Sequence, residues 1–510
     1  DGKSWWFDLT DFTPILTGDK RMFLSRGGQN QEEMDIEFLF IKGTPSRNVI
    51  SLDQIWPTQQ YQPNYTQIQA NTTIFPEIEV PVAENVKGLK IRSAITGHGQ
   101  DGEFIPRNHT ISAGDTTFTW SVWKECANNP VYPQGGTWIY DRAGWCPGMA
   151  TDVAEYDVLD RVQDGTLTVD YNVTAGSGDS RYIVNNQLVS YGDYNFNTDI
   201  SIEDIIEPSN KAAHARDNPM CINPKMLIKN TGKDLIYSVT VDYWVNDKSN
   251  KRTFKWACHL NSEGNETVYF PIDDGIWSTA TTESNYFHAE IVGVNGSIDE
   301  YLPNNKFKSA FDLPEFYAPD LILFYRTNSA ASENSITIKD QWDKIAFERT
   351  NLQSNTLYRD TVKLGLGCKT LEIKDSDGDG MSFFANNDGS GFFRINRVGG
   401  GIEHIANPDF GNFYKLNFTV LHPVNVPEKN LSLGYKLYPN PTRGNITISG
   451  GDFLNTECEI LNSLGQQVSF NIENSGDKMN LTLIDSAPGF YVIKLTQNGY
   501  VWTKKIIVEQ

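Results

Sequence analysis

Short runs of alternating apolar and polar residues dominate this 510-residue chain. Examples are DIEFLFI (35–41), TFTWSVW (117–123) and YSVTVDYWV (237–245), and glycine, asparagine, aspartate and proline separate such runs at short intervals. Alternation with a period of two places one face of a β-strand on a core, whereas the 3.6-residue period of amphipathic helices is almost absent here. The pattern predicts an all-β chain of tandem jelly-roll or β-sandwich domains followed by Ig-like β-sandwich modules.

Polar, proline-containing links divide the chain, because its length exceeds what one hydrophobic core usually organises. One such link is PTQQYQPNYTQ (57–67), and another is EPSNKAAHARDNP (207–219). We expect five units, which cover residues 1–56, 57–206, 207–314, 315–425 and 434–510. The unit at 207–314 resembles an Ig-like adhesion module of the CARDB type.

Composition and charge restrict the class of protein. Hydrophobic residues make up 39% of the chain and its net charge is −21, so we expect globular domains and no nucleic-acid partner. No apolar run approaches the length of about 18 residues that a transmembrane helix needs. Residue 1 is Asp and no signal peptide follows, so we expect a processed or partial chain. The six cysteines contain no CxxC pair, which argues against structural zinc and fits an oxidising compartment.

The stretch YDRAGWCPGMA (140–150) combines an arginine with a cysteine in a loop rich in glycine and proline. The guanidinium of Arg142 is always charged and suits a carboxylate or a developing oxyanion. A disulfide between Cys146 and Cys126 could close this loop and would contribute about 3 kcal/mol in the chain-entropy model. The loop therefore has the properties of a preset functional loop.

A second polar loop lies in AITGHGQDGEFIPRNHTI (94–111). Ionisable residues gathered between strands are functional candidates, and here they are His98, Asp101, Glu103, Arg107 and His109. The alternative is a solvated loop whose charges have no catalytic task.

Residues 88–158 resemble the second jelly roll of the peptide-N-glycosidase F family, through DRAGWCPGMA (141–150) and EFIPRNHTI (103–111). The resemblance extends over residues 1–205, and residues 7–48 look like the last strands of the family's first jelly roll. It implies two jelly rolls side by side, a fold shared with copper-dependent peptide-amidating monooxygenases. It also implies hydrolysis of the amide between asparagine and the first N-acetylglucosamine of N-glycosylated proteins or glycopeptides, without a catalytic cofactor.

The resemblance assigns roles residue by residue. Glu103 matches the essential glutamate of the second jelly roll and Arg142 the active-site arginine, so both are predicted to be catalytic, with Arg142 facing the glycan core or the departing amide. Cys126 and Cys146 fall where the family has a disulfide. The predicted substrate-binding residues are His98, Arg107, His109, Asp141 and Trp145.

Several positions depart from the family's pattern. The family's primary catalytic aspartate lies in a strand that would precede Asp1, so we expect little or no amidase activity from residues 1–510 alone. Two family contacts fall near Ser25 and Gly27, which do not match them. A family tryptophan is replaced near His98, and Asp101 and Ile105 replace a cysteine pair.

Two other functions are compatible with these residues. A copper monooxygenase of the same fold would use His98 and His109 as ligands, although such sites need several histidines and a methionine. A non-catalytic glycan-binding or adhesive surface protein would stack sugars on Trp138, Tyr140 and Trp145.

The end of the chain resembles the C-terminal sorting domain of the type IX secretion system of Bacteroidetes. The resemblance rests on YKLYPNPTRGNITISG (435–450), CEILNSLGQQV (458–468) and APGFYVIKLTQNGYVWTKKIIV (487–508). It implies the type IX secretion machinery as a partner and a secreted or cell-surface location. The alternative is one more terminal Ig-like module.

The motif DSDGDG places Asp375, Asp377 and Asp379 at alternating positions. Close carboxylates suit a hard cation such as calcium, and the spacing opens like an EF-hand loop. Asn386, however, stands where the bidentate glutamate of that loop belongs, and strands flank the motif. We expect either a polar turn or a weak structural calcium site without a catalytic role.

Overall fold

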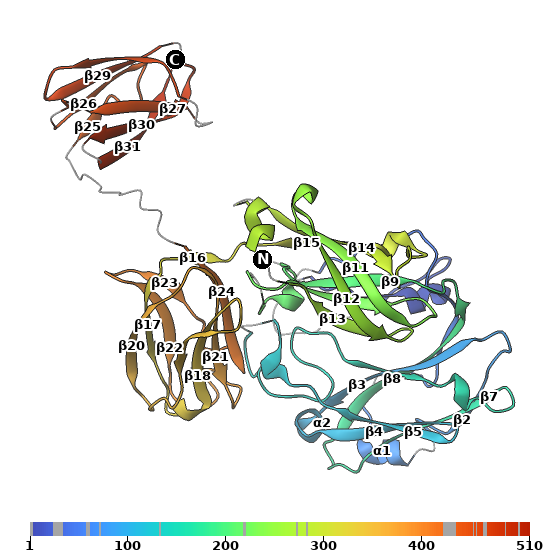
Figure 1. The fold of residues 1–510 in the computed structure, drawn as a ribbon. Coiled ribbons are helices and arrows are strands. Elements are labelled where there is room, and N and C mark those ends of the chain that lie inside the picture. The colour runs from blue at the N-terminus through green and yellow to red at the C-terminus, as the bar shows by residue number, and fades with distance from the viewer. Residues whose placement is uncertain are drawn as a thin grey trace. The chain divides into compact units, whose positions relative to one another are not determined.

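The computed structural model is built from β-strands almost throughout, which confirms the predicted all-β class (Figure 1). The chain forms two compact units, Asp1–Val420 and Leu421–Gln510. The described helices are short, and none combines the length and hydropathy of a membrane span. The structure describes residues 4–23, 34–57, 62–70, 73–131, 134–217, 221–271, 274–281, 284–421, 435–451, 453–454, 456–462, 467–484, 486–497 and 500–509.

The first complete sandwich is an eight-stranded jelly roll made of two four-stranded antiparallel sheets (Figure 1). One sheet has the order β1 (Arg47–Gln54), β8 (Arg181–Tyr194), β3 (Gly88–His98), β6 (Val153–Asp157). The other has the order β2 (Ile78–Pro81), β7 (Thr166–Val173), β4 (Arg107–Ala113), β5 (Thr116–Val122). Every second residue of β3 is buried, so one face of the strand packs on the core and the other face does not, as expected for a half-buried strand.

The N-terminal segment differs from the prediction. The run at 35–41 was expected to form a strand, but no described strand pairs with it. Phe40 and Ile41 are 83% and 91% exposed. Alternation alone does not make a strand, because its backbone groups need a neighbouring strand as partner. β1 lies inside the range expected for the first unit, 1–56, yet it pairs with β8 of the jelly roll.

An Ig-like sandwich follows, with a three-stranded and a four-stranded sheet. The first sheet has the order β13 (Asn265–Tyr269), β10 (Lys225–Asn230), β9 (Ile200–Glu207). The second has the order β12 (Arg252–Leu260), β11 (Ile236–Val245), β14 (Asn285–Val294), β15 (Lys306–Phe311). β9 begins within the range expected for the jelly roll, but Ile200, Ile202 and Ile205 pack into the core of this sandwich.

The third sandwich contains the DSDGDG motif at the end of one of its central strands. Its five-stranded sheet has the order β16 (Glu315–Tyr317), β24 (Phe413–Val420), β21 (Gly367–Asp375), β18 (Asn334–Asp340), β19 (Ile345–Arg349). Its other sheet has the order β20 (Leu357–Lys363), β17 (Asp320–Arg326), β22 (Phe392–Arg397), β23 (Ile402–Ile405). A disulfide between Cys221 and Cys368 ties this sandwich to the segment that precedes β10.

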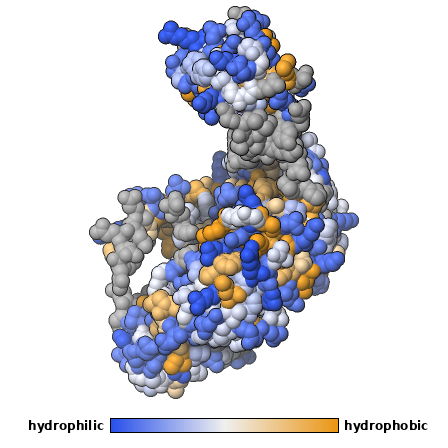
Figure 2. All heavy atoms as spheres, turned by 90° about the vertical axis from the view of Figure 1, so that its left-hand side faces the viewer, coloured by the Kyte–Doolittle hydropathy of each residue, from blue (hydrophilic) through white to orange (hydrophobic). Residues whose placement is uncertain are grey.

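The second unit is a small sandwich with its own core. Its sheets have the orders β25 (Lys436–Tyr438), β26 (Asn445–Ser449), β29 (Lys478–Leu483), β28 (Phe470–Asn474), and β27 (Glu457–Asn462), β30 (Gly489–Gln497), β31 (Tyr500–Val508). Across the visible face of the molecule, hydrophobic and hydrophilic side chains are interspersed (Figure 2). Single exposed apolar residues of this kind are normal on protein surfaces.

Candidate active site in the second jelly roll

The loop that carries Arg142 follows β5, and a backbone bridge and a disulfide tie its two ends together. The backbones of Lys124 and Arg142 form an antiparallel bridge, with N–O distances of 2.8 and 3.1 Å. Cys126 and Cys146 form the predicted disulfide, which confirms that pairing. Asp141 adds a third tie, because its carboxylate accepts a hydrogen bond from the Cys126 amide at 3.0 Å. We call residues 124–146 the arginine loop.

The glutamate-bearing loop begins where β3 ends and turns through the short helix α2 (Gln100–Phe104). Gly97 is tightly enclosed here, since a Cβ on it would lie 1.9 Å from the Gly102 carbonyl oxygen. Ala143 joins the two loops, because its amide donates to the Glu103 carbonyl at 2.9 Å and its carbonyl accepts from the Gly97 amide at 2.9 Å. The backbone therefore fixes Glu103 and Arg142 beside each other.

Glu103 and Arg142 form an ion pair whose arginine is buried. Arg142 is 4% exposed, and its Nε donates to Oε1 of Glu103 at 2.9 Å. Its Nη1 donates to the Tyr140 carbonyl at 2.6 Å, and its Nη2 to the Thr137 carbonyl at 2.8 Å. The guanidinium is thus aimed at Glu103 and at its own loop.

This arrangement changes the role predicted for Arg142. The guanidinium lies against the rings of Phe104 and Trp145, with 5.2 and 5.3 Å to their centroids. The Glu103 side chain remains 21% exposed against 5% for Arg142, so the carboxylate is the part of the pair that reaches solvent. Arg142 therefore orients Glu103 and does not itself face outward.

His98 and Trp145 lie next to this pair. Their rings stack with 6.3 Å between centroids, and Trp145 Nε1 donates to the Gly97 carbonyl at 3.3 Å. His98 Nε2 lies 2.8 Å from the Thr96 hydroxyl. Burial lowers the pKa of His98, although the nearby carboxylate of Glu103 opposes that shift, and the lowered pKa favours the neutral imidazole.

Asp141 and Arg107, two other predicted site residues, interact with neighbouring groups of the protein. Asp141 caps the Cys126 amide, and burial raises its pKa despite that hydrogen bond. Arg107 starts β4 and lies close enough to Tyr182 to oppose the rise that burial causes in the tyrosine pKa.

His109 is a core residue, which corrects its predicted role in substrate binding. It is 2% exposed, its Nδ1 lies 2.7 Å from the Tyr171 hydroxyl, and its ring meets Tyr182 edge-on at 4.6 Å. Burial lowers its pKa to about 3. Position 109 faces inward because β4 buries it together with Ile111 and Ala113.

Trp138 is likewise not available for stacking on a sugar. It is completely buried, and its Nε1 donates to the Asp409 carboxylate of the third sandwich at 3.2 Å. Ala127, Ile139 and Phe383 complete a small apolar cluster around it. Tyr140, in contrast, remains 42% exposed. Among the residues that hold the arginine, Thr137 escaped prediction because it acts mainly through its backbone carbonyl, for which a sequence has no signal.

An acidic cluster forms at the DSDGDG motif, but its members differ from the predicted Asp375, Asp377 and Asp379. Glu333, Asp375 and Asp379 each offer an oxygen, and these oxygens lie within 4.8 Å of one another, whereas Asp377 is exposed outside the group. Burial, followed by the charges of Asp375 and its neighbours, raises the pKa of Glu333 to about 7. Within the described ranges this is the one group of at least three His, Cys, Asp or Glu residues so arranged, and it contains no histidine. The copper alternative therefore finds no support in these residues.

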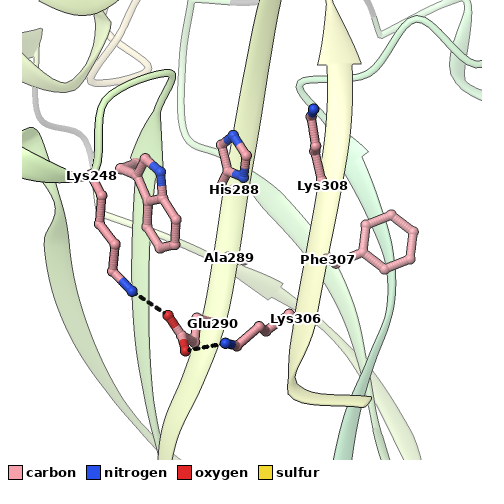
Figure 3. A pocket seen from close by; sticks show the side chains of 8 residues that line it. Lys248, His288, Ala289, Glu290, Lys306, Phe307 and Lys308 are labelled. Atoms are coloured by element: carbon pink, nitrogen blue, oxygen red, sulfur yellow. Dashed lines mark hydrogen bonds and ion pairs between the residues drawn. The ribbon is translucent and has the colours of Figure 1, made fainter. Parts of the chain in front are cut away.

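A pocket lies on the four-stranded sheet of the Ig-like sandwich, and none of the residues of the two clusters lines it (Figure 3). His288 stacks on Trp244 at 5.1 Å, and Glu290 bridges Lys248 and Lys306. The lysines that line this pocket are paired with Glu290 or lie over an aromatic ring, as Lys308 does over Tyr286.

Two family models match separate parts of the chain. Residues 64–190 match the C-terminal domain of peptide-N-glycosidase F, and residues 436–509 match the secretion system C-terminal sorting domain. The chain is also 28% identical over 215 residues to peptide-N(4)-(N-acetyl-β-D-glucosaminyl)asparagine amidase F of Elizabethkingia miricola. That alignment covers 36% of this chain and 57% of the relative, so little more than half of the relative is represented.

Solved structures show weaker likeness. The crystal structure of peptide-N(4)-(N-acetyl-β-D-glucosaminyl)asparagine amidase is 23% identical, with a TM-score of 0.26 over 30% of this chain and 55% of that one. SGBP-B of the mixed-linkage glucan utilization locus of Bacteroides ovatus, solved with a heptasaccharide, is 14% identical, with a TM-score of 0.19 over 61% of this chain and 71% of that one. Neither score supports an argument about function.

The sorting domain indicates that the protein is secreted or attached to the cell surface. Glu103, Arg142 and both cysteines of the Cys126–Cys146 disulfide lie inside the stretch that matches the glycosidase family. Residues 64–190 are therefore a domain of the peptide-N-glycosidase F C-terminal family, and residues 436–509 of the same chain are a type IX secretion sorting domain.

Proposed function

We propose that the complete protein is a secreted amidase of the peptide-N-glycosidase F type, which hydrolyses the amide between asparagine and N-acetylglucosamine in N-linked glycoproteins. The observation that carries this proposal is the Glu103–Arg142 pair, because it sets a partly exposed carboxylate in a fixed direction. The match to the family over residues 64–190 supports the same substrate class.

Glu103 is the group proposed to act on the substrate. A fixed carboxylate can take a proton from an attacking water molecule or accept hydrogen bonds from sugar amides and hydroxyls. Arg142 is a positioning residue, since its Nε–H holds Oε1 while its other donors hold Tyr140 and Thr137. His98 and Trp145 offer an aromatic surface beside the carboxylate on which the apolar face of a sugar ring can stack.

The experiment compares glycan release by Glu103→Gln and by the unchanged protein. The protein includes any residues that precede Asp1 in its gene, the substrate is a denatured N-glycoprotein, and mass spectrometry detects the conversion of asparagine to aspartate. We expect Glu103→Gln to lower the rate about 100-fold, the scale for loss of one key electrostatic group. Glu84→Gln, an exposed glutamate of the same jelly roll, is the matched control. Wild-type release by a folded Glu103→Gln protein would reject the assignment.

A second candidate is a non-catalytic glycan-binding surface protein. The observation that favours it is that Arg142 already pairs with Glu103 and donates to the carbonyls of Tyr140 and Thr137, so few of its donors remain for a developing oxyanion. Calorimetric binding of a glycopeptide without any release of glycan would identify this function.

A further inference from the structure

We propose that the third sandwich binds a calcium ion through Glu333, Asp375 and Asp379, and that this ion braces the arginine loop of the jelly roll. From the sequence motif alone, the predicted calcium ligands were Asp375, Asp377 and Asp379. The structure replaces Asp377 by Glu333, which lies 42 positions before Asp375 and is brought to it by strand pairing.

The fold creates the convergence of these carboxylates. β18 and β21 are neighbours in one sheet (Figure 1), and Asn334 pairs with Asp375 in their register. Glu333, the residue just before β18, therefore lies beside the loop that follows β21. Calcium binds oxygen at about 2.3–2.6 Å, so two ligands on opposite sides of one ion lie roughly 5 Å apart. The 4.8 Å limit on the oxygen separations in this cluster fits that size.

Unpartnered buried oxygens supply the second observation. Asp379 is 6% exposed, and its Oδ1 finds no hydrogen-bond partner among the described residues. Oε2 of Glu333 is also buried without a partner in that part of the chain. No described lysine or arginine forms an ion pair with any of the three carboxylates. Burying unpaired carboxylates is costly, and a bound cation would compensate the charge of both residues.

The chemistry of the cluster favours calcium among the common cations. All three ligands are carboxylates, which suit hard cations such as calcium, magnesium and manganese, and oxygens up to 4.8 Å apart fit the larger calcium ion best. Gly378 and Gly380 adopt φ angles of +83° and +75°, which lets the loop fold back so that Asp379 meets Asp375. The amides of Gly378 and Asp379 donate to Oδ1 of Asp375 at 2.6 and 3.2 Å. The loop is therefore already shaped around the site.

The same loop packs directly on the arginine loop. A Cβ on Gly378 would lie 3.1 Å from Cβ of Ala127, the residue after Cys126. Asn412 links the two sides, because its carbonyl accepts from the Asp375 amide at 2.8 Å and its amide donates to the Ala127 carbonyl at 3.1 Å. Its side chain also donates to Oδ1 of Asn128 at 2.7 Å. One residue thus joins a proposed calcium ligand to the arginine loop.

A second contact strengthens this connection. Trp138 of the arginine loop donates to Asp409, and its ring lies 3.0 Å from where a Cβ on Gly411 would stand. The segment 408–412 therefore lies between the acidic cluster and the loop that carries Arg142. An ion that orders residues 375–379 would order this segment and, through it, the arginine loop.

Calorimetry on residues 1–510, freed of metal by chelation and titrated with calcium chloride, tests the site. We expect one calcium ion per chain, and an affinity at least about tenfold lower in Asp379→Asn and in Glu333→Gln, since ligand charge sets calcium affinity. Asp320→Asn and Glu348→Gln remove exposed carboxylates of the same sandwich and should bind calcium as the parent does. No binding up to about 10 mM calcium, or unchanged binding by both cluster variants, would overturn the site. Tighter binding of magnesium than of calcium would overturn the choice of ion.

Hydrogen–deuterium exchange tests the coupling. Calcium should slow amide exchange in peptides from 124–146 of the parent and of Asp320→Asn, but not of Asp379→Asn. Calcium binding without any change in these peptides would overturn the coupling to the arginine loop. Neither measurement involves glycan release, so the outcome is independent of the proposed amidase function.

Discussion

The Glu103–Arg142 pair has one carboxylate and its own cation, whereas the Glu333–Asp375–Asp379 cluster has three carboxylates and no cation among the described residues. Nε of the buried Arg142 lies 2.9 Å from Oε1 of Glu103 and compensates its charge. The acidic cluster has no basic partner in the part of the chain that the structure describes. The difference shows that charge compensation, and not the number of acids, separates a site that is complete in the folded chain from one that needs a ligand.

The two sites also share one structural element. The arginine loop supplies Arg142 to the first and packs through Ala127 on the loop of the second. Changes at either site therefore test the same comparison.

Arg142→Ala should have the largest effect on stability. It leaves Glu103 without its buried partner and frees the carbonyls of Thr137 and Tyr140, so we expect the free energy of unfolding of the jelly roll to fall by about 3–5 kcal/mol. Urea unfolding followed by tryptophan fluorescence measures the loss. Arg181→Ala removes an exposed arginine paired with Asp179 and should cost less than about 1 kcal/mol. Equal losses in the two variants would show that burial of the pair does not matter.

Opening the disulfide should come next. The double change Cys126→Ser and Cys146→Ser should lower the free energy of unfolding by about 3 kcal/mol, because the unfolded chain gains entropy. Differential scanning calorimetry provides the measurement. Cys258→Ser, which removes a free thiol of the Ig-like sandwich, is the control and should leave the jelly-roll transition unchanged.

Glu333→Gln should act with the opposite sign from a change at Glu103. In chelator, it removes one of three neighbouring like charges, so we expect the third sandwich to gain on the order of 1 kcal/mol. Glu103→Gln should lose stability because Arg142 then lacks its counter-charge. Parallel urea unfolding of the two variants shows the signs, and a loss of stability in both would remove the contrast between the sites.

His109 provides a third case, because burial keeps its imidazole uncharged, whereas a counter-charge compensates Glu103. The folded-state pKa of about 3 lies below the unfolded value near 6.5, so the unfolded chain binds a proton in that window and the folded chain does not. Stability that is present above pH 6.5 is therefore lost as the pH falls, by about 0.7 kcal/mol between pH 7 and pH 6. Urea unfolding of the jelly roll at both values measures this loss. An NMR titration that shows His109 gaining a proton near pH 6.5 in the folded protein would contradict the expectation.

Much of the architecture could be predicted because strand alternation is a local property. The sandwiches and the Cys126–Cys146 disulfide follow from short segments and a motif. The run at 35–41 has the same alternation but remains without a described partner strand, since pairing depends on what lies beside a segment.

The sequence pointed to Glu103 and Arg142 as neighbours but not to the orientation of their side chains. Glu103 and Arg142 do meet, yet a sequence does not show that the guanidinium turns inward toward Thr137. His109 is polar but faces the core because of its strand parity. Glu333 could only be found through the register of β18 and β21, which is non-local information.

The Cys221–Cys368 bond has a mechanical consequence for a protein held outside the cell. Its two cysteines are 147 positions apart, and the whole of β10–β15 lies between them. When the two ends of the chain are pulled apart, force passes along β9 and across the sulfur bridge to β21, and the backbone between the two cysteines is bypassed. A protease that cuts once between Cys221 and Cys368 leaves every part of the chain covalently joined, so the N-terminal domain stays connected to the segment that precedes the sorting tail.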